Sequence, residues 1–165
     1  MGNQIIISLI LIMFCYISLQ IFTLYYLKNK NRVKGGPMLG DTIRDIEVID
    51  INKNKINLSK ILSSQPKLII FVDMNCAHCK NIINSLNVFN KDLLKDIHFF
   101  LVNNEENVRE LKKRRNNKNF YFLNEEDVFD NFNVRLFPFY MELNGNKIVQ
   151  KKGYASGNTI IEYLT

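Results

Sequence analysis

Two cysteines separated by two residues are the part of this sequence best suited to chemistry. Cys76 and Cys79 flank Ala77-His78 and follow an apolar run, where a helix is predicted to begin. A cysteine in the first turn of a helix faces unpaired backbone N–H groups and the positive end of the helix dipole, which both stabilise a thiolate. Cys79 lies on the same helix face, so the pair can close a disulfide. We predict that Cys76 attacks and that Cys79 resolves the mixed disulfide.

Two polar side chains near this pair are candidates for tuning it. His78 is predicted to donate a hydrogen bond or positive charge to the Cys76 thiolate, and stabilising the reduced form makes a disulfide more oxidising. The alternative is an exposed histidine that merely fits the first helical turn. Asp73 is predicted to cap the helix turn, with proton transfer at Cys79 as the alternative. His98, on a predicted strand, is expected to be a packed or edge residue, with a catalytic role as the alternative.

A metal site is not favoured by the sequence. A structural zinc site needs about four ligands. The available side chains are Cys76, Cys79, His78 and the distant His98, because Cys15 lies in an apolar segment. Thiol-disulfide chemistry needs no organic cofactor, so we expect none beyond the redox-active disulfide itself.

The elements that would position the cysteines alternate between strand and helix. Residues 67–72 form an almost continuous apolar run, typical of a strand buried on both faces, and are the expected centre of a sheet. Asn144-Gly145 is a strong hairpin signal. The order of elements predicts an α/β fold with a mixed sheet and helices on its faces. The predicted elements are strands at 46–51 and 55–58, a turn of helix capped by Ser59 through Leu62, the strand at 67–72, a helix containing Ile82, Ile83, Leu86, Phe89 and Leu93, a strand at 97–102, a helix at 108–115, a strand at 120–123, a helix at 125–132, strands at 137–143 and 147–152, and a terminal helix with Ile160, Ile161 and Leu164.

The N-terminal segment has a different composition from the rest of the 165 residues. Residues 5–27 carry no charged side chain, and a helix of that length, about 34 Å at about 1.5 Å per residue, would cross a hydrocarbon core of roughly 30 Å. A cleaved signal peptide fits less well, because residues 1–4 contain no Lys or Arg. We predict a membrane anchor at 1–27, a basic linker at 28–40 and a folded domain at 41–165, with residues 5–27 in contact with lipid.

Charge gives two opposing indications about location. Lys28, Lys30, Arg32 and Lys34 account for four of the six net positive charges, so the overall charge does not indicate nucleic acid binding. By the positive-inside rule this cluster would keep the domain in the cytoplasm. A protein dithiol oxidant, however, works where disulfides persist, outside the cytoplasm. We favour the extracytoplasmic side of the cell membrane.

Taken together, these features resemble the membrane-anchored thiol-disulfide oxidoreductases of the TlpA/ResA type, within the thioredoxin superfamily. A closer resemblance is to the methylamine dehydrogenase accessory protein MauD and its relatives, which are thought to assist disulfide formation in an extracytoplasmic partner. The motifs that carry it are the anchor, the basic linker, Gly40-Asp41, residues 71–79, Phe137-Pro138-Phe139, Asn144-Gly145 and Gly153.

The resemblance implies a thioredoxin-like fold with a mixed central sheet and an N-terminal β-hairpin. It also implies that Pro138 is cis and faces the cysteines, that Phe137 lines a groove for the substrate polypeptide, and that the substrate is a thiol- or disulfide-containing protein. A trans proline at the start of a strand is the alternative. The sequence departs from many thioredoxins at Asn75, where they have Trp, and at Ile70, where they have a buried acid.

The predicted function is therefore that of a membrane-anchored thiol-disulfide oxidoreductase. The competing hypothesis is a non-catalytic tethered adaptor with the same fold, whose cysteines are vestigial or bind copper during partner maturation. A peroxidase fits less well, because the Thr-rich approach to a single peroxidatic cysteine is missing.

Overall fold

The computed structural model of this protein describes residues 2–30, 35–62, 65–90, 92–102 and 119–165. The helix predicted at 108–115 lies outside the described residues. The chain divides into two compact units, Met1–Lys34 and Gly35–Thr165, and each is considered by itself.

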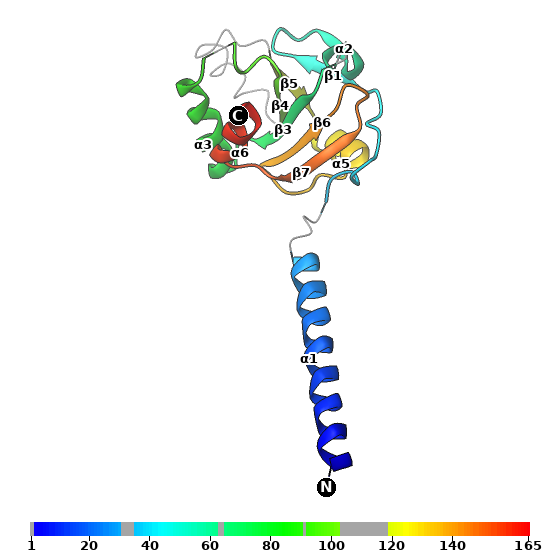
Figure 1. The fold of residues 1–165 in the computed structure, drawn as a ribbon. Coiled ribbons are helices and arrows are strands. Elements are labelled where there is room, and N and C mark those ends of the chain that lie inside the picture. Colours follow the sequence, from blue (N-terminus) through cyan, green and yellow to red (C-terminus); the bar gives the residue numbers. More distant parts are fainter. Residues whose placement is uncertain (1, 31–34, 63–64, 91, 103–118) are drawn as a thin grey trace. The chain divides into compact units, whose positions relative to one another are not determined.

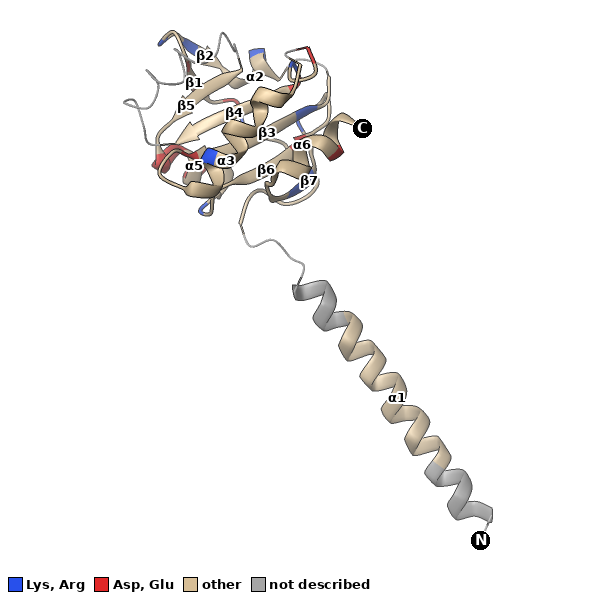
Figure 2. Ribbon diagram, turned by 90° about the vertical axis from the view of Figure 1, so that its left-hand side faces the viewer, with Lys and Arg blue, Asp and Glu red and all other residues tan. Residues whose placement is uncertain are grey.

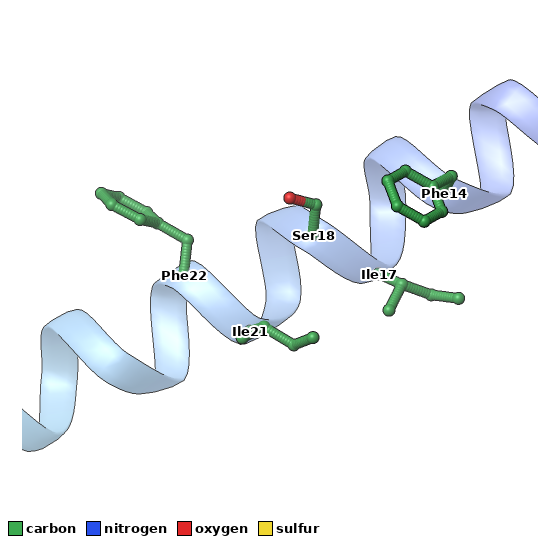
Figure 3. Close-up of a pocket in the computed structure, with 5 residues that line it drawn as sticks. All are labelled: Phe14, Ile17, Ser18, Ile21 and Phe22. Carbon is green, nitrogen blue, oxygen red and sulfur yellow. The ribbon is translucent and has the colours of Figure 1, made fainter.

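The N-terminal unit contains one helix, α1 (Gly2–Lys30). Its large apolar side chains between residues 9 and 24 are exposed. Figure 3 shows five of its side chains, spaced three and four residues apart around a shallow hollow: Phe14, Ile17, Ser18, Ile21 and Phe22. Among the described residues, no helix combines the length and apolar character needed to cross a membrane. The transmembrane anchor predicted at 5–27 is not confirmed by this finding.

The second unit is built on a seven-stranded mixed sheet, shown in Figure 1, whose strand order is β2-β1-β5-β4-β3-β6-β7. β3 runs parallel to β4 and antiparallel to β6, and β1 pairs antiparallel with both β2 and β5. The strands are β1 (Glu47–Asp50), β2 (Lys55–Asn57), β3 (Lys67–Asp73), β4 (Ile97–Val102), β5 (Phe120–Leu123), β6 (Phe139–Leu143) and β7 (Val149–Tyr154). This is the thioredoxin-like α/β architecture that the sequence predicts.

β3 and β4 are the most deeply buried strands of the sheet. Every residue of β4 is buried, as is β3 up to Val72, which confirms the prediction from their apolar runs. The middle strand is β4, however, and not β3 as we expected from the sequence. The reason is that β5 pairs with the far side of β4 and the β1–β2 hairpin extends the sheet beyond it.

Helices cover both faces of this sheet. α3 (Ala77–Ser85) and α6 (Gly157–Leu164) lie together on one face in Figure 1, where Ile83 and Ile160 join the core with Ile70 of β3. α5 (Glu125–Phe132) covers the opposite face, and the Phe132 ring lies 4.9 Å from that of Phe71. Acidic residues gather in the first turn of α5 (Figure 2), where the helix dipole favours negative charge.

Two local predictions were wrong. α3 ends at Ser85 and passes through a 3-10 turn at Leu86–Val88, after which Phe89 is extended, so Leu93 is not helical and is 52% exposed. The prediction was wrong because Phe89 and Leu93 keep the spacing typical of a helix although the chain is no longer helical at these positions. The short helix α2 (Leu58–Ile61) has Asn57 and not Ser59 at its N-cap. Ser59 lies inside the helix, and its N–H and hydroxyl both donate to the Asp45 carboxylate at 2.7 Å.

The second unit begins with an ordered segment, residues 35–43, which we call the strap. It includes residues 35–40 of the predicted linker. The strap runs beside the β6–β7 connection, with the Gly40 N–H donating to the Val149 carbonyl at 2.9 Å and the Ile43 N–H to the Lys147 carbonyl at 3.0 Å. The strap is therefore packed on the domain through backbone hydrogen bonds.

His98 of β4 is packed as predicted, with 5% of its surface exposed and its ring 5.8 Å from that of Tyr121. Neither ring nitrogen has a hydrogen-bond partner among the described residues. Burial lowers the pKa of His98 to about 4, helped by the charge of Lys67 and opposed by that of Asp96. The unfolded chain therefore binds a proton between about pH 6.5 and 4 that the folded chain does not, so stability falls as the pH drops through this range.

We predict that His98→Leu removes much of this acid sensitivity. The wild type should lose about 3 kcal/mol of unfolding free energy between pH 7 and 4 through this residue, at about 1.36 kcal/mol per pKa unit. Urea unfolding at both pH values measures the loss. The control is Ile97→Val on the same strand, which should destabilise the protein by a similar amount at both pH values. An equal pH slope in wild type and His98→Leu would refute the assignment.

Candidate active site

The cysteine pair lies where β3 ends and α3 begins. Cys76 is the N-cap residue of α3, with extended backbone angles of φ −84° and ψ 126°. The preceding turn is held by Asp73, whose carboxylate accepts the Asn75 N–H at 2.8 Å and whose carbonyl accepts the Cys76 N–H at 3.0 Å. Asp73 thus stabilises the turn before the helix, but the N-cap residue of α3 is Cys76 and has no side-chain cap, so the predicted capping by Asp73 is not confirmed.

The two sulfurs occupy different environments. Both cysteines are free thiols, but Cys76 is partly exposed whereas Cys79 is 0% exposed. The Asp73 N–H donates to the Cys79 sulfur at 3.4 Å, and the Cys76 thiol donates to the Phe137 carbonyl at 3.8 Å. One sulfur is therefore accessible from solvent, and the other is held inside the fold.

Cys76 is the more acidic thiol. Its pKa is lowered chiefly by the backbone amide of Cys79, and less strongly by the Cys79 thiol and the His78 backbone amide. Burial and the negative charge of Asp73 oppose this effect. The lowered pKa follows from the helix N-terminus, whose first N–H groups have no partners within the helix.

Cys79 is shifted in the opposite direction. Burial raises its pKa to about 12, the Cys76 thiol and the charge of Asp73 add to the increase, and the backbone amide of Asp73 opposes it. At neutral pH, Cys76 is therefore the better source of thiolate and Cys79 stays protonated. This difference matches an attacking thiol and a resolving thiol.

The loop that contains Phe137 and Pro138 faces Cys76. The Phe137-Pro138 peptide bond is cis, which confirms the prediction. The Pro138 carbonyl accepts the Ala155 N–H at 3.0 Å, and Phe137 packs partly buried against the core beside Cys76. The structure thus brings together Cys76, Cys79 and the Phe137-Pro138 loop from distant parts of the sequence.

His78 is exposed, and the contribution that the structure assigns to it comes from its backbone amide. A role for its imidazole ring stays a prediction. The Ala155 amide that donates to the Pro138 carbonyl could not be predicted from the sequence, because a backbone donor leaves no signal in the residue types. In the described part of the chain, no group of three or more His, Cys, Asp or Glu residues could hold a metal ion.

Comparison with solved structures shows the same fold in several proteins. The thioredoxin domain of a thiol-disulfide oxidoreductase from Bacteroides vulgatus matches with a TM-score of 0.57 and 18% identity, over 78% of this chain and 99% of that one. The exposed lipoprotein thioredoxin of Streptococcus pneumoniae matches with a TM-score of 0.55 and 15% identity, over 73% and 98%.

A third similar structure is a thiol peroxidase from Chromobacterium violaceum, with a TM-score of 0.55 and 13% identity, over 80% of this chain and 88% of that one. No protein-family profile matches the sequence. No curated protein sequence matches it significantly either. The comparisons therefore assign the chain to the thioredoxin-like fold.

The charge of Asp73 gives a testable consequence. We predict that Asp73→Asn moves the pKa of Cys76 further down, because the negative charge that opposes the thiolate is removed while the side-chain acceptor for the Asn75 N–H is kept. The pH dependence of iodoacetamide alkylation, measured in a Cys15→Ser background, reports this pKa. Asp92→Asn, at an exposed loop position, is the control. A midpoint that stays constant or rises in Asp73→Asn would contradict the prediction.

Proposed function

We propose that this protein is a thiol-disulfide oxidoreductase that exchanges disulfides with partner proteins. The observation that carries the proposal is the unequal pair at the start of α3, where backbone amides lower the pKa of Cys76 and burial raises that of Cys79. Further support comes from the fold, which is shared by a thiol-disulfide oxidoreductase domain from Bacteroides vulgatus and a lipoprotein thioredoxin from Streptococcus pneumoniae.

The exchange proceeds in two displacements. The Cys76 thiolate attacks one sulfur of a partner disulfide, which forms a mixed disulfide and releases the other sulfur as a thiolate that takes up a proton. Cys79 then loses its proton and attacks the Cys76 sulfur, closing the Cys76–Cys79 disulfide and releasing the second partner thiolate. The partner gains two electrons and the protein loses two. In the reverse direction, the same steps insert a disulfide into the partner.

Features around the sulfurs support the choice of a protein as substrate. The Phe137 carbonyl lies beside Cys76, where an extended polypeptide can pair with the backbone of the Phe137-Pro138 loop. A lowered pKa at Cys76 stabilises the reduced form, which favours disulfide donation, and His78 would add to this if its ring carries a proton near the thiolate. The resemblance to MauD relatives supports a partner that acquires its disulfides outside the cytoplasm.

The direct test is to trap the intermediate. We predict that Cys79→Ser accumulates a mixed disulfide through Cys76 with partner proteins, because the resolving thiol is missing. Cys76→Ser should trap none, and Cys15→Ser should behave as wild type. Non-reducing gels followed by mass spectrometry of the linked peptides measure the adducts.

The same experiment separates the enzyme from a non-catalytic adaptor. If partner maturation continues in Cys76→Ser and no adduct forms in Cys79→Ser, the adaptor is favoured. Binding of copper to the wild type in that case would point to metal handling.

We further propose that helix α1 anchors the protein in a membrane, with the second unit on the extracytoplasmic side. Support comes from the absence of charge over residues 5–27 and from exposed apolar side chains that water solvates poorly, among them Leu11, Phe14 and Phe22. The requirement for an oxidising compartment supports the orientation.

A membrane-impermeant maleimide applied to intact cells tests this location. We predict that the protein fractionates with membranes and that Cys76 is labelled from outside after reduction with an impermeant phosphine. The control is Cys76→Ser, which should lose the label. Labelling that appears after cell lysis alone would place the domain in the cytoplasm, and recovery in the soluble fraction would contradict the anchor.

A further inference from the structure

The first two residues of the strap contact residues that flank the Phe137-Pro138 loop. The Gly36 N–H donates to the Asn133 carbonyl at 2.8 Å. A Cβ added to Gly36 would collide with the Phe139 ring, and the φ of Gly36 is +73°. This position therefore requires glycine both for its backbone angle and for its close approach to the ring.

Lys152 of β7 holds the strap in this place. Its ammonium group donates to the Gly35 carbonyl at 2.8 Å and to the Gly36 carbonyl at 3.3 Å. The side chain is partly buried, and burial lowers the pKa of Lys152 while the charge of Asp41 opposes this. A partly desolvated ammonium group that donates to two carbonyls makes a charge-assisted contact, which is stronger than one between neutral groups.

These contacts lie at both ends of the loop that carries the candidate substrate-binding residues. Asn133 ends α5 in a left-handed conformation with φ +51°, and Phe139 begins β6. Between them, the Phe137 carbonyl contacts the Cys76 thiol at 3.8 Å. The strap therefore contacts one residue before and one residue after Phe137-Pro138.

We propose that Lys152 and Gly36 are positioning residues that clamp the strap against Asn133 and Phe139, hold the Phe137-Pro138 loop in place, and so control the rate at which Cys76 reacts with protein substrates. The inference rests on the proposed function. A protein substrate needs the loop backbone at a fixed position for pairing, whereas a small disulfide needs only the Cys76 sulfur. The clamp therefore affects large and small substrates differently.

Lys152→Met tests the inference, because it keeps the length of the side chain and removes the donor. The matched control is Lys151→Met on the neighbouring residue, an exposed lysine whose amine lies 3.1 Å from a Glu142 carboxylate oxygen. Lys152→Arg retains the charge and the donors and serves as the rescue. Gly36→Ala perturbs the other side of the clamp, so the test does not depend on one variant folding.

The measurements are rate constants with insulin as the protein disulfide and with bis(hydroxyethyl) disulfide as the small one, together with the pH midpoint of Cys76 alkylation. We expect Lys152→Met to lower the rate with insulin about tenfold or more, since misplaced positioning groups can cost up to about 10²-fold. The rate with the small disulfide should stay within twofold of the wild-type rate. The pH midpoint of Cys76 alkylation should not change. Gly36→Ala should give the same pattern, and Lys152→Arg should recover most of the loss.

An equal fall with both disulfides, or a Lys152→Met protein that matches Lys151→Met, would overturn the inference. Amide hydrogen exchange tests the clamp even if the proposed function is wrong, because it does not depend on disulfide exchange. If the wild type exchanges with no protein disulfide, the proposed function fails. The clamp is then judged by the N–H groups of Gly36 and Ala155, which should exchange faster in Lys152→Met than in Lys151→Met, and equal exchange in the two variants would overturn it.

Discussion

The whole site depends on the unpaired backbone amides at the start of α3. Cys76 and Cys79 are chemically identical and three residues apart, yet one meets these amides near the surface and the other is enclosed by the core. The pKa of the first is lowered and that of the second is raised to about 12. The direction of both displacements in the proposed exchange follows from this difference.

The fold produces the difference in pKa between the two cysteines by fixing where β3 ends. That strand is buried between β4 and β6, so the turn at Asp73 begins at a defined place. Pairing of β3 with β6 also carries the Phe137-Pro138 loop to Cys76 from 61 residues away in the chain. Asp73 adds a negative charge at this turn, which opposes the lowering of the Cys76 pKa.

Much of this arrangement could be predicted from local sequence. Residues 97–102 form the predicted strand, because a continuous apolar run is a strong local signal. Residues 125–132 form the predicted helix, which begins after an Asn124 cap and has three acids in its first turn. The central place of β4 could not be predicted, since strand order depends on pairings between distant segments. The length of α3 was overestimated because the apolar spacing continues to Leu93 beyond the end of the helix.

The site was predictable to a similar degree. The spacing of Cys76 and Cys79 indicated the chemistry, but the complete burial of Cys79 depends on how α3 packs. Gly35-Gly36 and the proline that follows predict a linker, because this composition is typical of one. Their contacts with Asn133 and Phe139 come from residues about a hundred positions away, which no local pattern contains.

The most direct measurement is an NMR titration of the reduced protein with ¹³Cβ-labelled cysteine, in the Cys15→Ser background. The Cβ shift of Cys76 should titrate below the value of an ordinary thiol, near 8.5. That of Cys79 should show no transition until the pH approaches about 12. Two overlapping transitions near the ordinary value would contradict the account.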